Sequence, residues 1–151
     1  MNKKLCSYIG LVAIIFLVDR ITKLVALAHC IQSACTVNSL LSFEVVFNRG
    51  ISWGMFHGDS DALFIGVSAI IALITLILCG YAYYHYMRGN VVVAEVCIIV
   101  GSLCNLIDRV IYGGVVDFII LSYGHLSWPV FNIADAVIVF GVSLLVFKYE
   151  K

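Results

Sequence analysis

The stretch ALFIGVSAIIALITLILCGYAYYHY, residues 62–86, contains no Asp, Glu, Lys or Arg. A helix needs about 20 apolar residues to cross the hydrocarbon of a bilayer, so this stretch predicts a transmembrane helix. Outward from it, three further apolar runs approach that length, at 5–28, 91–111 and 130–148. The whole chain of 151 residues is 63% hydrophobic, with a mean hydropathy of +1.09, which is typical of membrane proteins. We predict an all-α membrane protein with four transmembrane helices in a single membrane-embedded domain, 1–151.

The first apolar run also has features of a cleavable signal peptide. Lys3 and Lys4 precede it, and small residues follow near Ala28. However, Asp19 and Lys23 lie before that point, where a cleavable segment is normally uncharged. We therefore expect the run to be retained as a helix.

The basic residues give the orientation. If four helices alternate in direction, five of the nine basic residues fall on one side: Lys3, Lys4, Arg88, Lys148 and Lys151. The positive-inside rule makes that side the cytoplasm and places both termini there. The charges balance to a net charge of zero, so a nucleic-acid partner is not indicated.

With this orientation, polar side chains from separate segments reach one depth near the outer interface. Ionisable residues inside spans are rare and mark functional sites by default. Ion pairs of Asp19 with Lys23 and of Asp108 with Arg109 are an equally good structural explanation for those residues. Asp117 and Asp135 have no basic residue within five positions, so that explanation is weaker for them. The residues that converge are Asp19, Asn48, Asn105, Asp108, Asp117, Asn132 and Asp135.

Asp117 and Asp135 are each flanked by apolar residues, which disfavour a charge on either carboxylate. If the two face each other, they would titrate as a coupled pair that holds one proton at neutral pH, as in an aspartic protease. Water is then the nucleophile. Asn105 and Asn132 each precede an aspartate by three residues, share a helix face with it, and could orient it or hold a substrate carbonyl.

The same residues allow two other functions, a transporter and a non-enzymatic scaffold. A transporter or proton-translocating subunit would use the same acids as a relay, but would spread them over the membrane depth. A non-enzymatic scaffold does not explain two unpaired aspartates at one level. Four histidines and six cysteines show no metal-ligand spacing, so we expect no metal and no cofactor. Cys30 and Cys35 share an external loop and could form a disulfide in an oxidising compartment.

At these residues the sequence resembles the lipoprotein signal peptidases, also called signal peptidase II. The resemblance covers nearly the whole chain. It rests on five segments: DRITK (19–23), FNRGISWG (47–54), GSLCNLIDR (101–109), VVDF (115–118) and FNIAD (131–135).

The resemblance implies an aspartic endopeptidase of the bacterial inner membrane, with its active site near the outer face. It would cut diacylglyceryl-modified prolipoproteins just before the lipidated cysteine. Its partners would be that substrate and membrane lipid, and we expect a monomer. The resemblance makes Asp117 and Asp135 the catalytic pair. Supporting or substrate-binding positions would be Asp19, Lys23, Asn48, Gly50, Gly101, Asn105, Asp108, Arg109, Asn132 and Ala134.

The resemblance also assigns the remaining segments. An extracytoplasmic loop, about 29–61, would contain a small substrate-cradling sheet, and an active-site loop, about 112–129, a mobile element. Trp53 and Trp128 are placed as interfacial anchors would be. Glu95 is expected to reach toward cytoplasmic water. The sequence departs from the usual pattern at five positions, none of which removes a carboxylate or amide: Val100, Cys104, Ser52, Ser102 and Ala136.

Overall fold

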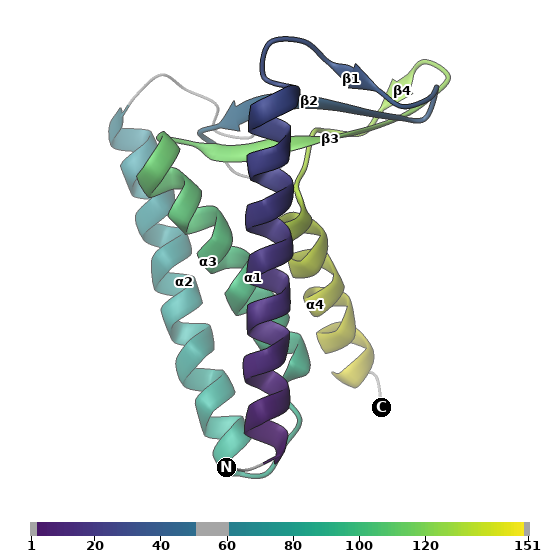
Figure 1. Cartoon of the computed structure of the whole chain (residues 1–151). Coiled ribbons are helices and arrows are strands. Elements are labelled where there is room, and N and C mark those ends of the chain that lie inside the picture. Colours follow the sequence, from purple (N-terminus) through teal and green to yellow (C-terminus); the bar gives the residue numbers. More distant parts are fainter. Residues whose placement is uncertain (1–2, 51–60, 150–151) are drawn as a thin grey trace.

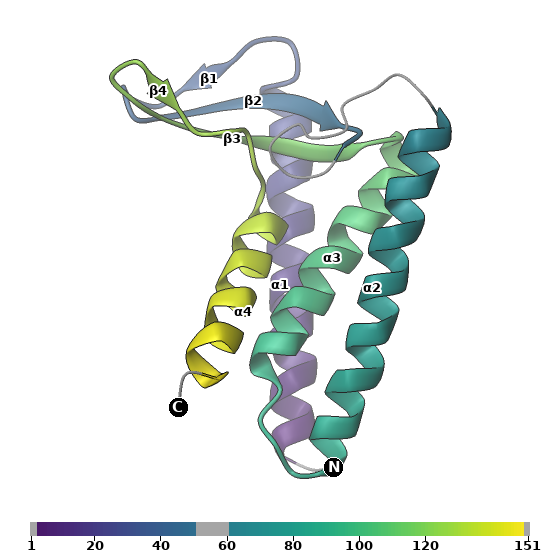
Figure 2. The same cartoon turned by 180° about the vertical axis from the view of Figure 1, so that it is seen from behind.

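A computed structural model of the chain describes residues 3–50 and 61–149, which form four helices and a small sheet (Figure 1). A helix lies at each of the four apolar runs, with ends close to those of the run. Their bounds are Lys3–His29 for α1, Asp61–Met87 for α2, Val93–Tyr112 for α3 and Ile133–Tyr149 for α4. Viewed from behind, α3 lies between α2 and α4, with α1 on its far side (Figure 2).

One helix of the described segments, α2, is long and apolar enough to cross a membrane on length and composition alone. The apolar part of α4, Ile133–Phe147, is shorter. The outer surface of the bundle nevertheless carries many exposed aliphatic side chains, such as Ile14 on α1, Ile77 on α2 and Val139 on α4. Apolar side chains outside and ionic ones inside are the arrangement expected for helices in lipid.

The sheet lies across the end of the bundle opposite the N-terminus (Figure 1). Its strands are antiparallel in the order β1 (Cys35–Thr36), β2 (Leu41–Asn48), β3 (Val115–Tyr123) and β4 (Leu126–Ser127). Strands β1 and β2 lie within the loop for which a small sheet was expected. Val46 pairs with Asp117 and Asn48 with Val115, so the end of β2 lies beside the aspartate of β3.

The segment 112–129 is not the loop that the sequence predicted. Most of it is the strand β3, followed by a turn at Gly124 (φ +60°) and the short strand β4. The stretch VVDFIILSY is rich in β-branched and aromatic residues, which favour a strand, and β2 supplies the pairing partner. Asp117 is therefore fixed within a paired strand.

Close packing joins α3 to α4. A Cβ atom at Gly101 would lie 2.7 Å from both the Ala134 carbonyl oxygen and Ile138, and one at Gly141 2.8 Å from the Ala94 carbonyl oxygen. Small residues let helix backbones approach closely in membranes, where no hydrophobic effect drives helices together. This approach brings the polar residues of α3 next to the start of α4.

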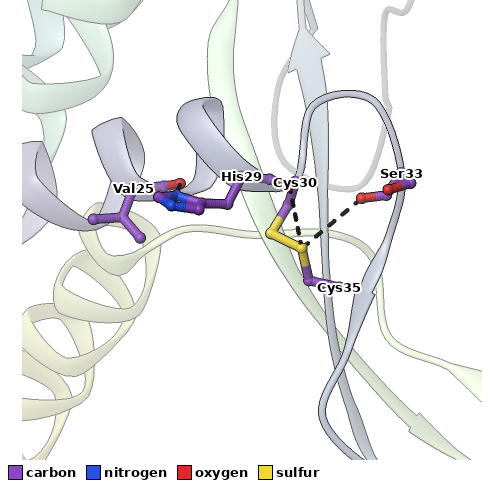
Figure 3. The surroundings of a disulfide bond; sticks show 5 residues. All are labelled: Val25, His29, Cys30, Ser33 and Cys35. Atoms are coloured by element: carbon purple, nitrogen blue, oxygen red, sulfur yellow. Dashed lines mark hydrogen bonds between the residues drawn. A yellow bond between two sulfur atoms is a disulfide. The ribbon is translucent and has the colours of Figure 1, made fainter.

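A disulfide joins Cys30, directly after α1, to Cys35 in β1 (Figure 3). The Cys30 carbonyl also accepts a hydrogen bond from the Val45 amide in β2, at 3.4 Å. Both links fasten the sheet to the end of α1. The bridge that the sequence left open is therefore present in this structure.

Candidate active site

Asp117 and Asp135 are held by one asparagine. Asn132 donates from Nδ2 to Asp117 Oδ1 at 2.7 Å, and its backbone amide donates to Asp135 Oδ2 at 3.3 Å. The Asn132 side-chain oxygen accepts the Asp135 amide at 2.9 Å. Asn132 and Asp135 thus form a capping box at the start of α4, which explains their spacing of three. The cap that starts the helix also fixes one acid beside the other.

The remaining oxygen of each carboxylate accepts a hydrogen bond from the side chain of another asparagine, a different one for each aspartate. Asn48 of β2 donates to Asp117 Oδ2 at 3.0 Å, and Asn105 of α3 donates to Asp135 Oδ1 at 2.8 Å. The side-chain oxygen of Asn105, Oδ1, accepts hydrogen bonds from Lys23 Nζ at 3.1 Å and from Asn132 Nδ2 at 3.2 Å. Because a lysine ammonium can only donate, Lys23 fixes which end of the Asn105 amide faces Asp135.

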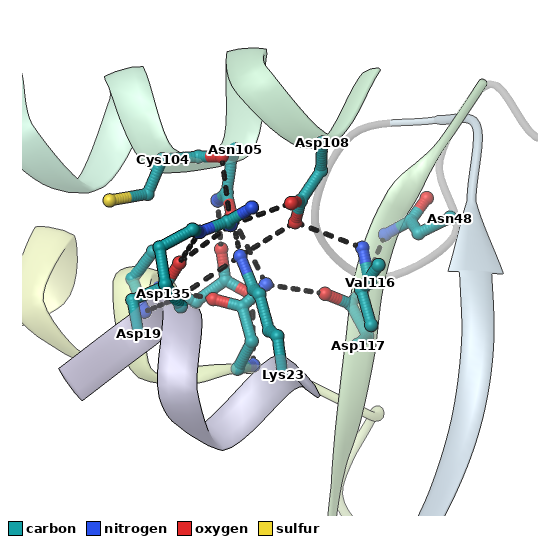
Figure 4. A network of polar contacts seen from close by, with 12 residues as sticks. Asp19, Lys23, Asn48, Cys104, Asn105, Asp108, Val116, Asp117 and Asp135 are labelled. Carbon is teal, nitrogen blue, oxygen red and sulfur yellow. Dashed lines mark hydrogen bonds and ion pairs between the residues drawn. The ribbon is translucent and has the colours of Figure 1, made fainter. Parts of the chain in front are cut away.

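Next to the two acids lies a largely buried cluster of four ions, drawn in part in Figure 4. Arg20 contacts Asp19 at 2.8 Å and Asp108 at 2.6 Å, and Lys23 contacts the same two carboxylates at 3.0 and 2.7 Å. Asp19 and Asp108 are fully buried. Two acids and two bases make the cluster neutral, which is the condition under which buried charges are tolerated.

The alternative in which Asp108 pairs with Arg109 does not occur in this structure. Adjacent residues on a helix point in different directions, and Arg109 instead donates to the Arg49 and Gly50 carbonyls and to Ser68 Oγ. It thereby holds the segment directly after β2. Asp108 pairs across the helices with α1. The expected pair of Asp19 with Lys23 is present.

The ion cluster also fixes the backbone beside each acid. Asp19 Oδ1 accepts the amide of Ala134, the residue before Asp135, at 3.2 Å. Asp108 Oδ2 accepts the amide of Val116, the residue before Asp117, also at 3.2 Å. Each buried carboxylate therefore positions one of the two site aspartates through its neighbour.

Asp117 is 2% exposed, between the buried side chains of Val116 and Phe118. Burial, and then the charge of Asp135, raise the pKa of Asp117 to about 7, against the opposing hydrogen bonds from Asn48 and Asn132. A carboxyl with this pKa carries a proton in part of the molecules at neutral pH. Asp135 is only partly buried, so water can reach the pair from its side.

Two cavities, of about 280 and 310 Å³, are each lined by both aspartates. The first, cavity A, also has Asn48, Asn105 and Arg109 in its wall. The second, cavity B, lies against Trp128 and Phe131. In the described part of the chain, no three His, Cys, Asp or Glu side chains are grouped as metal ligands would be.

The structure brings together all the described residues that the sequence assigned to the site. Gly50 donates its amide to Asn48 Oδ1 at 2.9 Å, and Gly101 supplies the helix contact described above. Trp53 and Ser52 lie outside the described residues. Glu95 is fully buried, so the expectation that it reaches water is wrong. Sequence reasoning gave no site role to Arg20, although its position next to Asp19 was a signal.

Comparisons with known proteins agree on one family. The sequence profile of signal peptidase (SPase) II matches residues 11–150. A lipoprotein signal peptidase of Aquifex aeolicus is 35% identical, and the match covers 99% of this chain and 89% of that protein. A lipoprotein signal peptidase of Thermodesulfovibrio yellowstonii is 36% identical, and the match covers 100% of this chain and 99% of that protein. A solved bacterial membrane enzyme superposes with a TM-score of 0.76 at 28% identity, covering 95% of this chain and 87% of its own.

Proposed function

The chain belongs to the signal peptidase II family, and on that premise we propose that Asp117 and Asp135 are the catalytic pair with which it removes signal peptides from prolipoproteins. One observation carries the assignment. The two carboxylates share Asn132 and line the same two cavities, so a peptide bond between those cavities would meet both. No other pair of acids in the described residues combines this geometry with contact to a cavity.

The surroundings divide the roles of the two acids. Asp117, with its pKa near 7, holds the proton and donates it toward the scissile carbonyl oxygen. Asp135, the more accessible carboxylate, takes a proton from the attacking water. As the C–N bond breaks, Asp135 gives the proton that it took from water to the leaving amine, and the hydroxyl of the tetrahedral intermediate returns its proton to Asp117 as the carbonyl re-forms. The pair thus begins and ends each turnover with one proton.

The rest of the network keeps this geometry in place. Asn48 and Asn105 each donate one N–H to a catalytic carboxylate, and the ion cluster fixes the backbone beside both. A catalytic group displaced by about 1 Å can lose about 100-fold in rate. Asp19, Lys23 and Asp108 are therefore positioning residues, and Arg109 holds the loop after Asn48.

We further propose that all four helices cross the membrane, with both termini in the cytoplasm and the sheet on the outer face. The positive-inside pattern supports this orientation. The disulfide supports it independently, because disulfides persist in oxidising compartments, and Cys30–Cys35 lies at the sheet end of the bundle. The substrate is then a prolipoprotein whose cysteine carries diacylglycerol, with its acyl chains still in the bilayer.

Cleavage of matched substrates tests this proposal. Purified protein in vesicles should cut a diacylglyceryl-modified prolipoprotein before the modified cysteine. It should cut the unmodified precursor much more slowly, even at saturating substrate, because the lipid fixes the depth of the scissile bond at the aspartates. Equal turnover of the two membrane-bound forms would contradict the proposal. A pH-driven ion flux without cleavage would indicate a transporter instead.

A further inference from the structure

One phenylalanine at the start of α2 contacts two arginines near the site. The guanidinium of Arg49, directly after β2, lies over the ring of Phe64, with its central carbon 5.0 Å from the ring centroid. The guanidinium carbon of Arg109 on α3 lies 5.4 Å from the same centroid. Ser68, one turn further along α2, accepts a hydrogen bond from Arg109 at 3.4 Å. Residues four apart share a helix face, so one face of α2 contacts Arg109 twice.

At this position an aromatic ring contributes more than an aliphatic side chain would. Two like charges that share one contact repel each other, whereas the negative face of an aromatic ring attracts both. Arg109 is 5% exposed, and the Nε atoms of Arg49 and Arg109 are buried without a hydrogen-bond partner among the described residues. A cation–π contact is strongest when the cation has lost its water. Phe64 therefore stabilises both guanidiniums electrostatically as well as by apolar contact.

A continuous chain of hydrogen bonds leads from Arg109 to one of the two aspartates. Arg109 donates to the carbonyl oxygens of Arg49 and Gly50. The Gly50 amide donates to Asn48 Oδ1 at 2.9 Å, and Asn48 Nδ2 donates to Asp117 Oδ2 at 3.0 Å. The side-chain amide of Asn48 is thus held at both ends. A shift of Gly50 would therefore move the N–H group that the carboxylate of Asp117 accepts.

From these contacts, and resting on the proposed function, we infer that Phe64 is a positioning residue for cleavage. Its ring holds the guanidiniums of Arg49 and Arg109. Through the segment that follows β2, these arginines fix the Asn48 amide on Asp117. Phe64 is not among the described residues that line cavity A or cavity B, so it acts through these neighbours and not by touching substrate.

The pH profile of cleavage reports on this route. The hydrogen bond from Asn48 lowers the pKa of Asp117, against the raising effects of burial and of Asp135. Charged groups lie near Asp117 on three neighbouring elements: Asp135 on α4, Lys23 on α1, and Asp108 and Arg109 on α3. Phe64→Leu loosens both Asn48 and Arg109, and each change lets the pKa of Asp117 rise. The fall in kcat/KM above about pH 7 should therefore move to higher pH. An unchanged profile would contradict the route through Asn48.

Substitutions that change the electrostatics of the ring but hardly its size test the inference most sharply. Phenylalanine carrying one, two or three fluorine atoms at position 64 should lower kcat for a diacylated prolipoprotein stepwise, because each fluorine weakens the attraction of the ring face for a cation. The same series at Phe140 is the matched control and should leave kcat unchanged within about twofold. Phe140 is 56% exposed on α4 and, in the described part of the chain, has no arginine over its ring. A flat series at position 64 would overturn the inference.

Two ordinary substitutions give a second readout. Phe64→Leu keeps an apolar side chain without a ring and should lower kcat by about threefold to thirtyfold, the fold-change to which cation–π contacts correspond, with KM within about twofold. Phe64→Tyr restores the ring and should recover most of kcat. Full activity of Phe64→Leu, or a change in KM alone, would contradict a positioning role. If Phe64→Leu does not fold, the fluorinated series decides, because it keeps the shape of the ring. Loss of cleavage of every substrate by the unmodified protein would instead refute the proposed function.

Discussion

Replacing Lys23 by methionine should strongly destabilise the protein, because it removes one of the four charges in the buried cluster. Lys23 is 1% exposed, and its ammonium contacts the carboxylates of Asp19 and Asp108 and the side-chain oxygen of Asn105. Methionine fills much of the same volume, so the change is mainly electrostatic. It leaves two buried carboxylates facing Arg20 alone, with a net charge of −1.

Removing one partner of a buried ion pair costs about 3–5 kcal/mol, because the other charge remains buried and uncompensated. We expect a loss in this range for Lys23→Met. The matched control is Arg49→Met, since the side chain of Asp61, its partner, is 83% exposed. Pairs of that kind contribute about 0–1 kcal/mol. The two substitutions remove the same charge but should differ severalfold in effect.

The free energy of unfolding can be measured for both variants in mixed micelles by titration with a denaturing detergent. The double variant Lys23→Met/Asp108→Asn should recover part of the loss, because it restores a neutral cluster. A double-mutant cycle then gives the coupling energy between the two residues. If Lys23→Met costs no more than Arg49→Met, or if Asp108→Asn adds its full cost on top, charge balance does not stabilise this cluster.

Three further predictions concern the pH profile, the helix contact and the disulfide. Asn48→Ser removes a hydrogen bond that lowers the pKa of Asp117, so the pKa of Asp117 should rise further. Since activity requires the protonated form of Asp117, the fall in kcat/KM above about pH 7 should move to higher pH. An unchanged pH profile would exclude this role for Asn48. Gly101→Ala should destabilise the protein by about 1–3 kcal/mol through overpacking. Gly66→Ala, with nothing near its Cβ position, should be neutral or stabilising by up to about 1 kcal/mol. A similar loss of stability in both variants would contradict the close α3–α4 contact. Cys30→Ser opens a loop closed across five positions and should cost about 2 kcal/mol on loop entropy relative to the unmodified protein. Under reducing conditions, where both proteins lack the bridge, this difference should vanish.

The helices could be predicted from the sequence because each apolar run has nearly the length of a membrane crossing. The convergence of acids could also be predicted, since depth follows from position along a helix of known rise. The spacing of Asn132 and Asp135 showed that they share a helix face. The structure adds that they form a capping box, so the same spacing serves both helix initiation and the site.

The contacts that sequence reasoning missed depend on how the helices are rotated about their axes. A pair of Asp108 with its neighbour Arg109 was one explanation that the sequence left open, but α1 presents Arg20 and Lys23 to Asp108 from across the bundle. Such pairing depends on tertiary packing, which local spacing does not report. The strand β3 was missed for a similar reason: its partner β2 lies about 70 residues earlier in the chain, and the pairing makes 115–123 a strand.

The most direct test of the catalytic assignment is the rate at which Asp117→Asn and Asp135→Asn cleave a diacylated prolipoprotein. An amide keeps the shape of each side chain and one of the two hydrogen bonds that each carboxylate accepts, but it cannot exchange the proton. Each variant should therefore lose activity by at least the roughly 100- to 10,000-fold that one acid–base group contributes. Glu44→Gln, an exposed acid on the same sheet, should retain it. Near wild-type turnover by either aspartate variant, in folded and membrane-inserted protein, would contradict the account.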